Sequence, residues 1–319
     1  MTVLAADVGG TNTRLALVGP EAGRPEAARY ENRGFSSFYE VLARYCAEHP
    51  LPPLGGCCVA IAGPVTSDRA RLTNLDWSID AASIASALPV ALPGPVVLVN
   101  DLFALGHSLG GLRPDQLLQI RAPDHGGAPN DQALVVGMGT GFNICLVRTG
   151  RAGALVSGAE LGHASLPTSV GAALSAAIGG AADRFSRIED LFSGRGLARL
   201  YHVFSDGALL GGAQILAAYG AGRRGPAAQS VELAARLLGI MAQELVFQYL
   251  PLAGIHFAGG AARGILGSQA RAVFLRAFDT PVPFGDLIGQ VPLRLITDDT
   301  AALSGAARHA VAAGLVQTA

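Results

Sequence analysis

Short apolar runs separated by polar, glycine-containing turns open the chain. Val3–Ala6 is apolar, a Gly-Gly turn follows, and Arg14–Val18 continues as a second run of strand length. This pattern predicts a β-hairpin. It recurs in the second half, where Ala133–Gly137 and Phe142–Arg148 flank a turn with glycine at alternate positions. Two hairpins of one kind, separated by about the length of a domain, predict a duplicated architecture.

The other strands and helices follow from the same kind of pattern. Four further apolar runs end at turn residues and predict buried strands: Cys57–Ala62, Val96–Val99, Gly254–Ala258 and Leu293–Ile296. Apolar residues at helical spacing predict helices between and after them: Phe35–His49, Ala81–Leu88, Ala172–Ala182, Gln214–Ala218, Ser230–Leu250, Ala301–Ala313 and one beginning near Leu102. Strands that alternate with helices predict an α/β fold.

Composition limits the function classes. The chain has 319 residues, enough for two domains, and is 50% hydrophobic and 15% charged, which excludes a mainly disordered chain. The net charge of −1 argues against a nucleic-acid-binding surface. All 23 basic residues are arginine. Because lysine is absent, a lysine Schiff base, a Walker A lysine and a protein-kinase lysine are excluded.

Targeting signals and cysteine usage predict a cytoplasmic protein. The mean hydropathy is +0.38, yet residues 81–100 contain three prolines and residues 164–182 are mostly Ala, Gly and Ser, so neither predicts a membrane span. The first residues lack the pattern of a signal peptide. The four cysteines lack metal-ligand spacing and are expected to be free thiols in a reducing compartment.

The first candidate site is the segment Asp7-Val8-Gly9-Gly10-Thr11-Asn12. Glycine lets a backbone approach a ligand closely, and successive N–H groups in such a turn form an anion-binding nest. Asp7, at the end of the predicted strand, is placed to hold a Mg²⁺ ion directly or through water. Taken alone, the segment also fits a plain hairpin turn.

The second candidate site is the turn Gly137-Met138-Gly139-Thr140-Gly141. Three glycines at alternate positions around a threonine fit a turn that surrounds a phosphate. The segment is not a dinucleotide-binding fingerprint, because Phe142 stands where that pattern requires its third glycine. Two turns of the phosphate type in one chain are less expected by chance than one.

Asn100-Asp101 follows the predicted strand Val96–Val99 directly. Open α/β sheets place ligands at this end of their strands. Asp101 is therefore a candidate for the group that accepts a hydroxyl proton during phosphoryl transfer. The pair also fits a helix N-cap, and both interpretations can hold together.

The segment Glu160-Leu161-Gly162-His163, with Glu189 further along, combines carboxylates and an imidazole around a glycine. Such groups suit a polyol ligand with several hydroxyls. The spacing also resembles part of a metal site, but no second His or Cys cluster completes one.

Gly106-His107-Ser108-Leu109-Gly110 matches the G-x-S-x-G elbow of serine hydrolases. The elbow should follow its strand immediately, whereas residues 100–105 intervene after the nearest strand. A helix interior or helix end with an exposed Ser108 is the alternative interpretation. A hydrolase and a sugar sensor without turnover are the competing function classes.

Together these residues resemble the bacterial glucokinase family of actin-like sugar kinases. The similarity runs in family order through nearly the whole chain, and its segments are residues 7–14 and 61–64, residues 73–77, Asn100-Asp101, Gly137–Gly141, Glu160–His163, Glu189, Ala258-Gly259-Gly260, and residues 297–299 with 303–307.

The resemblance implies two ribonuclease-H-like α/β domains flanking a deep cleft. The smaller is expected over residues 1–104 plus 302–319 and the larger over residues 105–301. It implies ATP-dependent phosphorylation of an aldohexose, most readily glucose to glucose 6-phosphate, by a homodimer without a DNA-binding region.

Individual roles follow from the same resemblance. Asp101 is expected as the general base. Sugar contacts are expected from Asn74, Asn100, Asp101, Glu160, His163 and Glu189. ATP and Mg²⁺ are expected at Asp7, Gly9, Gly10, Thr11, Asn12, Gly139, Thr140, Gly141, Gly259 and Gly260, with Asp7 as the metal-binding residue.

Four positions depart from the family pattern near the expected sugar. Phe142-Asn143 stands where the family usually has Leu-Gly, and Ala159 and Leu161 stand where it usually has glycine. These departures concern which hexose is preferred more than the chemistry.

Overall fold

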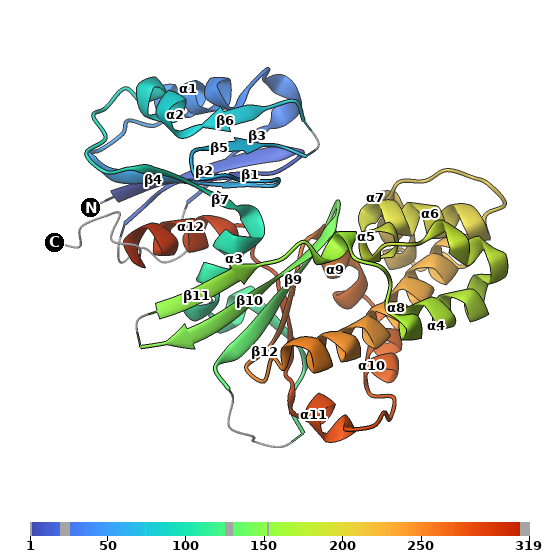
Figure 1. Cartoon of the computed structure of the whole chain (residues 1–319). Coiled ribbons are helices and arrows are strands. Elements are labelled where there is room, and N and C mark those ends of the chain that lie inside the picture. Colours follow the sequence, from blue (N-terminus) through green and yellow to red (C-terminus); the bar gives the residue numbers. More distant parts are fainter. Residues whose placement is uncertain (1, 20–25, 74, 125–129, 152, 313–319) are drawn as a thin grey trace. The chain divides into compact units, whose positions relative to one another are not determined.

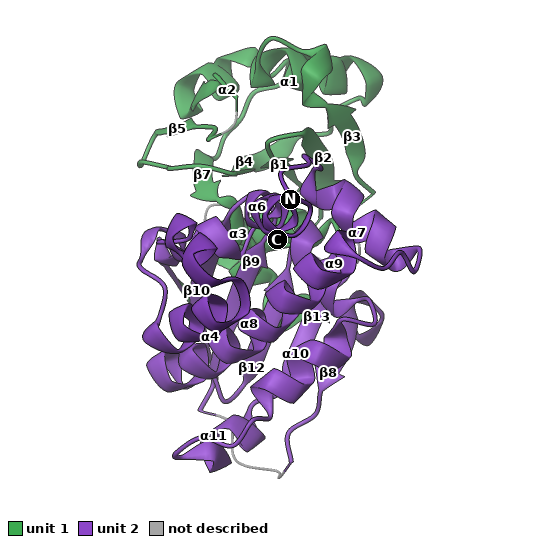
Figure 2. Cartoon of the chain, turned by 90° about the vertical axis from the view of Figure 1, so that its right-hand side faces the viewer, with its two compact units in different colours: residues 1–112, 150–156, 298–319 green, residues 113–149, 157–297 purple. Residues whose placement is uncertain are grey.

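The structure is a computed structural model that describes residues 2–19, 26–73, 75–124, 130–151 and 153–312. The chain forms two compact units (Figure 2). Unit 1 comprises residues 1–112, 150–156 and 298–319, and unit 2 comprises residues 113–149 and 157–297. Both contain strands and helices, which confirms the predicted α/β class.

Unit 1 is built on a five-stranded sheet of order β3-β2-β1-β4-β7. The predicted hairpin contributes β1 and β2, which are antiparallel. Strands β1, β4 and β7 run parallel to one another. The carboxyl ends of three strands therefore meet at one edge of the sheet. The strands are β1 (Thr2–Val8), β2 (Asn12–Val18), β3 (Ala28–Glu31), β4 (Leu54–Ile61) and β7 (Val96–Asn100).

Helices cover both faces of this sheet (Figure 1). Alternate residues of β1 point to opposite faces. Leu4 packs in the same cluster as α1 (Phe38–Glu48) and α2 (Ala81–Ala87). Ala5 packs in a second cluster with α3 (Asp101–Ser108) and α12 (Ala301–Ala312). The last described helix of the chain thus completes the core beside its first strand.

The second sheet has the order β11-β10-β9-β12-β13-β8. Its first five strands repeat the arrangement of unit 1, because β9 and β10 are antiparallel and β9, β12 and β13 run parallel. The duplicated architecture predicted from the two hairpins is confirmed, with β8 as an additional edge strand. The strands are β8 (Leu117–Arg121), β9 (Gln132–Met138), β10 (Phe142–Gly150), β11 (Gly153–Gly158), β12 (Gly254–Ala258) and β13 (Leu293–Ile296).

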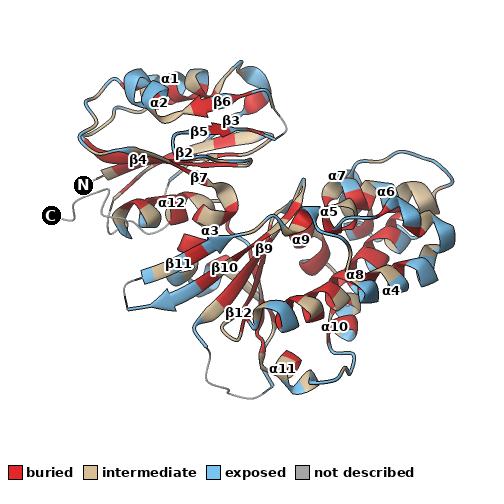
Figure 3. Ribbon diagram, viewed as in Figure 1, coloured by how far each residue is buried: buried red, intermediate tan, exposed pale blue. Residues whose placement is uncertain are grey.

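Most helices of unit 2 pack around α8, whose buried side chains belong to the large apolar core of this unit (Figure 3). The long helix begins at Pro226, earlier than expected, because proline suits the first turn of a helix. The helix expected over Ala172–Ala182 spans Thr168–Ile178, and its C-cap is Gly179, where φ is 57°. The helices are α4 (Thr168–Ile178), α5 (Ile188–Leu191), α6 (Gly194–Phe204), α7 (Gly212–Gly220), α8 (Pro226–Tyr249), α9 (Gly260–Leu266), α10 (Arg271–Phe278) and α11 (Gly285–Gln290).

The remaining elements are short. They are the strands β5 (Arg69–Arg71) and β6 (Ser78–Asp80) and the 3₁₀ helices η1 (Asn32–Gly34), η2 (Leu109–Gly111), η3 (Pro114–Gln116), η4 (Leu161–His163) and η5 (Gly179–Arg184). Within the described ranges, none of the helices combines the length and the apolar character that a membrane span requires.

Candidate active site

The β1–β2 turn of unit 1 presents backbone groups beside a half-buried carboxylate. Gly9 closes the turn with a hydrogen bond from its N–H to the Asn12 carbonyl at 3.0 Å, leaving Gly10 and Thr11 between them. Asp7 pairs with Arg14 across the hairpin, and their side chains lie 3.3 Å apart. Burial raises the pKa of Asp7, and Arg14 opposes this rise through its charge and its hydrogen bond.

Asn32 holds this turn and was not singled out from the sequence. Its side-chain amide donates to the Gly9 carbonyl at 2.7 Å, and its oxygen accepts from the Thr13 hydroxyl at 2.8 Å. Its backbone N–H donates to the Thr11 carbonyl at 2.9 Å. Asn32 and Thr13 are both buried. Because the pairing spans 23 residues, no local sequence pattern reveals it.

The predicted pair Asn100-Asp101 lies at the carboxyl end of β7, at the same sheet edge as the β1–β2 turn. Asn100 is the N-cap of α3, and its side-chain oxygen accepts from the N–H groups of Leu102 and Phe103. The cap interpretation therefore holds for Asn100, and Asp101 is the first helical residue. Its Oδ1 accepts from the Leu102 N–H at 2.9 Å.

The loop after β4 lies against these groups. The Asn100 amide donates to the Gly63 carbonyl at 3.3 Å. A Cβ on Gly63 would lie 2.1 Å from the Arg71 carbonyl oxygen, so only glycine permits this approach. Asn74, predicted to contact the sugar, lies outside the described residues.

The β9–β10 turn of unit 2 is enclosed by two neighbouring glycines. Its own hydrogen bond runs from Gly139 N–H to the Gly141 carbonyl at 3.0 Å, with Thr140 between them. Gly194, the first residue of α6, donates its N–H to the Gly139 carbonyl at 2.8 Å. Gly259 has φ of 97°, and a Cβ there would lie 2.5 Å from the Met138 carbonyl oxygen. The predicted Gly259-Gly260 segment therefore adjoins the predicted phosphate turn.

Glu189 lies beside this turn and beside the segment that carries His163. A Cβ on Gly141 would lie 3.0 Å from Glu189 Oε2. His163 Nδ1 is 3.8 Å from Glu189 Oε1. Hydrogen bonds from Ile188 to Ala164 and from Leu166 to Ser186 join the two segments. The structure thus brings together two residues that lie far apart in the sequence and were predicted to bind one ligand.

The carboxylates of Glu189 and Glu160 each contact a side chain that sequence analysis did not place in the site. Arg195, in the first turn of α6, approaches Glu189 Oε1 at 3.6 Å. Asn143, at the start of β10, donates to Glu160 Oε2 at 3.2 Å. Phe142 is buried and packs against Phe192, with ring centroids 5.9 Å apart. The Phe142 side chain therefore fills the core. The Asn143 side chain instead contacts Glu160, one of the residues predicted to bind the sugar.

The hydrolase interpretation of Ser108 is wrong. Ser108 is the last residue of α3 and not the tip of a strand-to-helix elbow. Its hydroxyl donates to the Leu105 carbonyl at 2.7 Å. It is 1% exposed, so the expected exposure is also wrong. A buried hydroxyl that caps its own helix is not presented to an ester.

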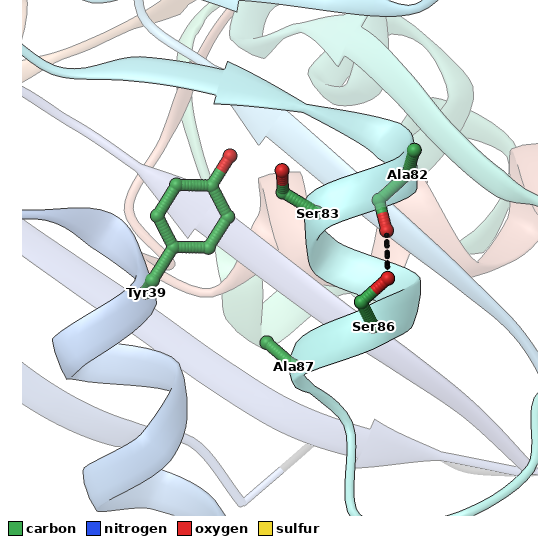
Figure 4. A pocket seen from close by; sticks show the side chains of 5 residues that line it. All are labelled: Tyr39, Ala82, Ser83, Ser86 and Ala87. Atoms are coloured by element: carbon green, nitrogen blue, oxygen red, sulfur yellow. Dashed lines mark hydrogen bonds between the residues drawn. The ribbon is translucent and has the colours of Figure 1, made fainter.

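A shallow hollow of about 460 Å³ lies between α1 and α2 of unit 1 (Figure 4). It is lined by Tyr39, Ala82, Ser83, Ser86 and Ala87. None of these residues is a predicted site residue, and the lining contains no acid or base other than the phenol of Tyr39. The hollow is not the candidate active site.

The groups around Asp7 fit a magnesium ion that is bound together with a nucleotide. Mg²⁺ usually takes one or two carboxylates and completes its shell with water and phosphate oxygens. Asp7 supplies a carboxylate, one oxygen of which contacts Arg14. In the ranges that the structure describes, no three His, Cys, Asp or Glu side chains gather as a closed metal site.

Comparisons with known proteins find similar sequences and similar folds. The sequence profile of the glucokinase family matches residues 4–313. A glucokinase of Xanthomonas euvesicatoria pv. vesicatoria (strain 85-10) is 28% identical over 324 residues, which cover 97% of this chain and 95% of that protein. A glucokinase from an Antarctic psychrotroph matches in structure with a TM-score of 0.76 and 25% identity, over 97% of this chain and 98% of that one.

A ROK family glucokinase from Streptomyces griseus, crystallised in complex with glucose and AMPPNP, matches with a TM-score of 0.61. It is 20% identical and covers 96% of this chain and 98% of its own. Both solved structures share the α/β fold of this chain.

Proposed function

The chain belongs to the glucokinase family, and from that premise we propose how its residues carry out the phosphorylation of glucose by ATP. Its fold is that of the actin-like ATPase sugar kinases. The observation that carries the assignment of roles is the placement of Asn100-Asp101 at the carboxyl end of β7, at the same sheet edge as the carboxyl end of β1, where Asp7 lies. This is the sheet edge where open α/β folds bind ligands.

In the proposed reaction Asp101 accepts the proton of the sugar C6 hydroxyl. The hydroxyl oxygen forms a bond to the γ-phosphorus, and the bond from that phosphorus to the β,γ-bridging oxygen breaks, releasing ADP. A positioned general base contributes about 10²–10⁴-fold to such a rate. Asn100 supports this role, because its cap fixes the first turn of α3, where Asp101 lies.

Sugar hydroxyls are assigned to the polar side chains that the sequence predicted for them, which are Asn74, Asn100, Asp101, Glu160, His163 and Glu189. A site built to hydrogen-bond a hydroxyl rejects a sugar that lacks it, because the protein groups are left without partners. The contact between His163 and Glu189 supports a shared ligand for these two residues.

The phosphates are assigned to backbone N–H groups of the turns at residues 9–12 and 139–141. Since the chain has no lysine, amide dipoles and Arg14 are the protein's own means of meeting phosphate charge near Asp7. Asp7 would hold Mg²⁺ directly or through water, and the bound ion would neutralise charge on the transferring phosphate. From the family resemblance we also propose a cytoplasmic homodimer. Light scattering on the purified protein tests whether it is a dimer.

The decisive experiment measures ADP release from MgATP across a panel of hexoses. Glucose is expected to drive release in the wild type. Asp101→Asn is expected to lower this rate by about 10²–10⁴-fold with little change in glucose affinity. Asp286→Asn, an exposed acidic residue of α11, is the matched control and should retain the wild-type rate.

Three outcomes separate the competing functions. If another hexose drives ADP release best, the mechanism stands and the assigned substrate changes. Glucose binding without ADP release identifies a sensor. An Asp101→Asn variant with the wild-type rate contradicts the proposed general base.

A further inference from the structure

The Asn143 side chain forms hydrogen bonds to two consecutive residues, Glu160 and Leu161. Its side-chain oxygen accepts from the Leu161 backbone N–H at 3.0 Å, and its amide donates to Glu160 Oε2 at 3.2 Å. The same oxygen also accepts from the Ile144 N–H at 2.9 Å, which fixes the side chain on its own strand. One side chain of β10 therefore sets both the backbone position and the carboxylate orientation of a residue 17 positions away.

The Glu160 segment depends on this support. Glu160 has φ −120° and ψ 48°, outside the regular helical and extended regions, and is the N-cap of η4. Its carbonyl accepts from the His163 N–H at 3.2 Å, but its side chain makes no cap hydrogen bond to that helix. Its side chain is exposed. Among the described residues, Asn143 is the side chain that hydrogen-bonds to the Glu160 carboxylate. A freely rotating carboxylate would lose rotational freedom on binding a sugar, whereas a held one has lost it already.

The held carboxylate remains available to a ligand. Asn143 contacts Oε2, and a carboxylate has acceptor positions on both oxygens. Oε1 can therefore accept a sugar hydroxyl while Oε2 stays bound to Asn143. The neighbouring Gly162 allows the close packing, because a Cβ there would lie 2.0 Å from the Phe142 carbonyl oxygen.

We propose that Asn143 is a positioning residue for sugar recognition, which fixes Glu160 so that its free oxygen accepts a hexose hydroxyl. This rests on the proposed function, because it assigns Glu160 to the sugar. A glycine at this position could make neither contact. The chain therefore uses a side chain of its own to set the orientation of this carboxylate.

The test is Asn143→Asp, which keeps the shape and the acceptor for Leu161 but replaces the donor to Glu160 with a like charge. The KM for glucose is expected to rise by about 10- to 100-fold, the effect of losing a hydrogen bond to a charged group. The KM for MgATP should stay unchanged, and kcat should change less than the KM for glucose. Asn143→Ala should raise the KM for glucose in the same direction if the aspartate variant does not fold.

Asn130→Asp is the matched control. Asn130 also donates to one oxygen, the Leu250 carbonyl, and accepts from one backbone N–H, that of Gln132. It precedes β9, at the end of that strand away from the Gly139–Gly141 turn. Its aspartate variant should keep the glucose KM within about twofold of wild type, as expected for independent sites.

A double-mutant cycle separates positioning from a general structural effect. In a Glu160→Gln background the introduced aspartate can accept from the glutamine amide, so Asn143→Asp should alter the glucose KM by less than about threefold. An equal penalty in both backgrounds overturns the proposal, and so does a glucose KM in Asn143→Asp that matches Asn130→Asp.

Calorimetric titration of the same variants with glucose keeps the two proposals apart. If the wild type binds glucose but releases no ADP, the kinase mechanism fails while the glucose Kd values still decide the role of Asn143. If the wild type binds no hexose, both proposals fall.

Discussion

Side chains outside the recognisable motifs help to hold the glycine turns of the candidate site in place. Asn32 is the example in unit 1, because its amide satisfies the Gly9 carbonyl and the Thr13 hydroxyl in a buried setting. A buried polar group left without a partner costs about 1–3 kcal/mol. The turn geometry therefore depends on a residue that follows it by 23 positions.

Asn32→Ala is expected to lower the unfolding free energy by about 2–4 kcal/mol, because the buried Thr13 hydroxyl and the half-buried Gly9 carbonyl lose their hydrogen bonds. The KM for MgATP should rise, since the turn proposed to bind phosphate is no longer held. Chemical denaturation and steady-state kinetics measure the two effects.

Thr13→Val is the control for this variant. It removes the hydrogen bond to Asn32 Oδ1 and leaves the bond to the Gly9 carbonyl in place. It should reduce stability by a smaller amount with little change in the KM for MgATP. Equal kinetic effects in both variants would contradict a specific role of Asn32 at the turn.

At the scale of elements, α3 and α12 pack so closely that a glycine is required between them. A Cβ on Gly305 would lie 1.8 Å from the Ala104 carbonyl oxygen. Gly305→Ala must therefore push the helices apart, and α3 begins at Asp101. We expect a loss of about 1–3 kcal/mol in stability together with a lower kcat, because the proposed base moves with its helix.

Gly171→Ala in α4 is the comparison, because a Cβ there meets nothing within 4 Å. It should stabilise the protein by about 0.5–1 kcal/mol through helix propensity alone. Thermal unfolding and kcat of the two variants test the pair. A Gly305→Ala protein as active and as stable as wild type would show that the helices can shift freely.

Elements with strong local patterns were predictable, and those shaped by distant contacts were not. Both hairpins and the buried parallel strands were identified because their apolar runs are bounded by glycine turns. Helix α6 was missed, since Gly194-Arg195-Gly196 looks like a loop. Gly196 is nevertheless required there, because a Cβ would lie 2.2 Å from the Leu191 carbonyl oxygen.

The candidate site divides in the same way. The glycine turns, Asp101 and the Glu160–His163 segment were predicted from spacing and resemblance. Asn32 and Arg195 were not, because each meets its partner only through folding. Asn143 was noticed as a departure from the family pattern, but its role appears only in its contacts with Glu160 and Leu161.

At the scale of the whole molecule, each unit buries an uncharged histidine. His107 in unit 1 is 8% exposed, and His256 in unit 2 is 7% exposed. Burial lowers the pKa of His107 to about 4, with a further contribution from His309. Burial also lowers the pKa of His256 to about 4, with a contribution from Arg294. The ordinary pKa of a histidine side chain is 6.5.

Acidification should therefore destabilise both units. Between pH 6.5 and pH 4 the unfolded chain binds more protons than the folded one, so stability falls as the pH falls through this window. Each histidine should account for on the order of 1–3 kcal/mol. Denaturant unfolding of wild type, His107→Gln and His256→Gln across this range is the measurement. Variants that keep the full wild-type slope would contradict the assignment.

The return of α12 to the first strands has a consequence for biosynthesis. Val3, Ala5, Ala16 and Cys58 share a cluster with Leu303 and Ala306, residues that the ribosome adds only after all of unit 2. One face of the five-stranded sheet stays without its cover while unit 2 is synthesised, although its strands emerge before that unit. A nascent chain must keep this face away from other apolar surfaces, and a chain that terminates before α12 leaves it exposed for good.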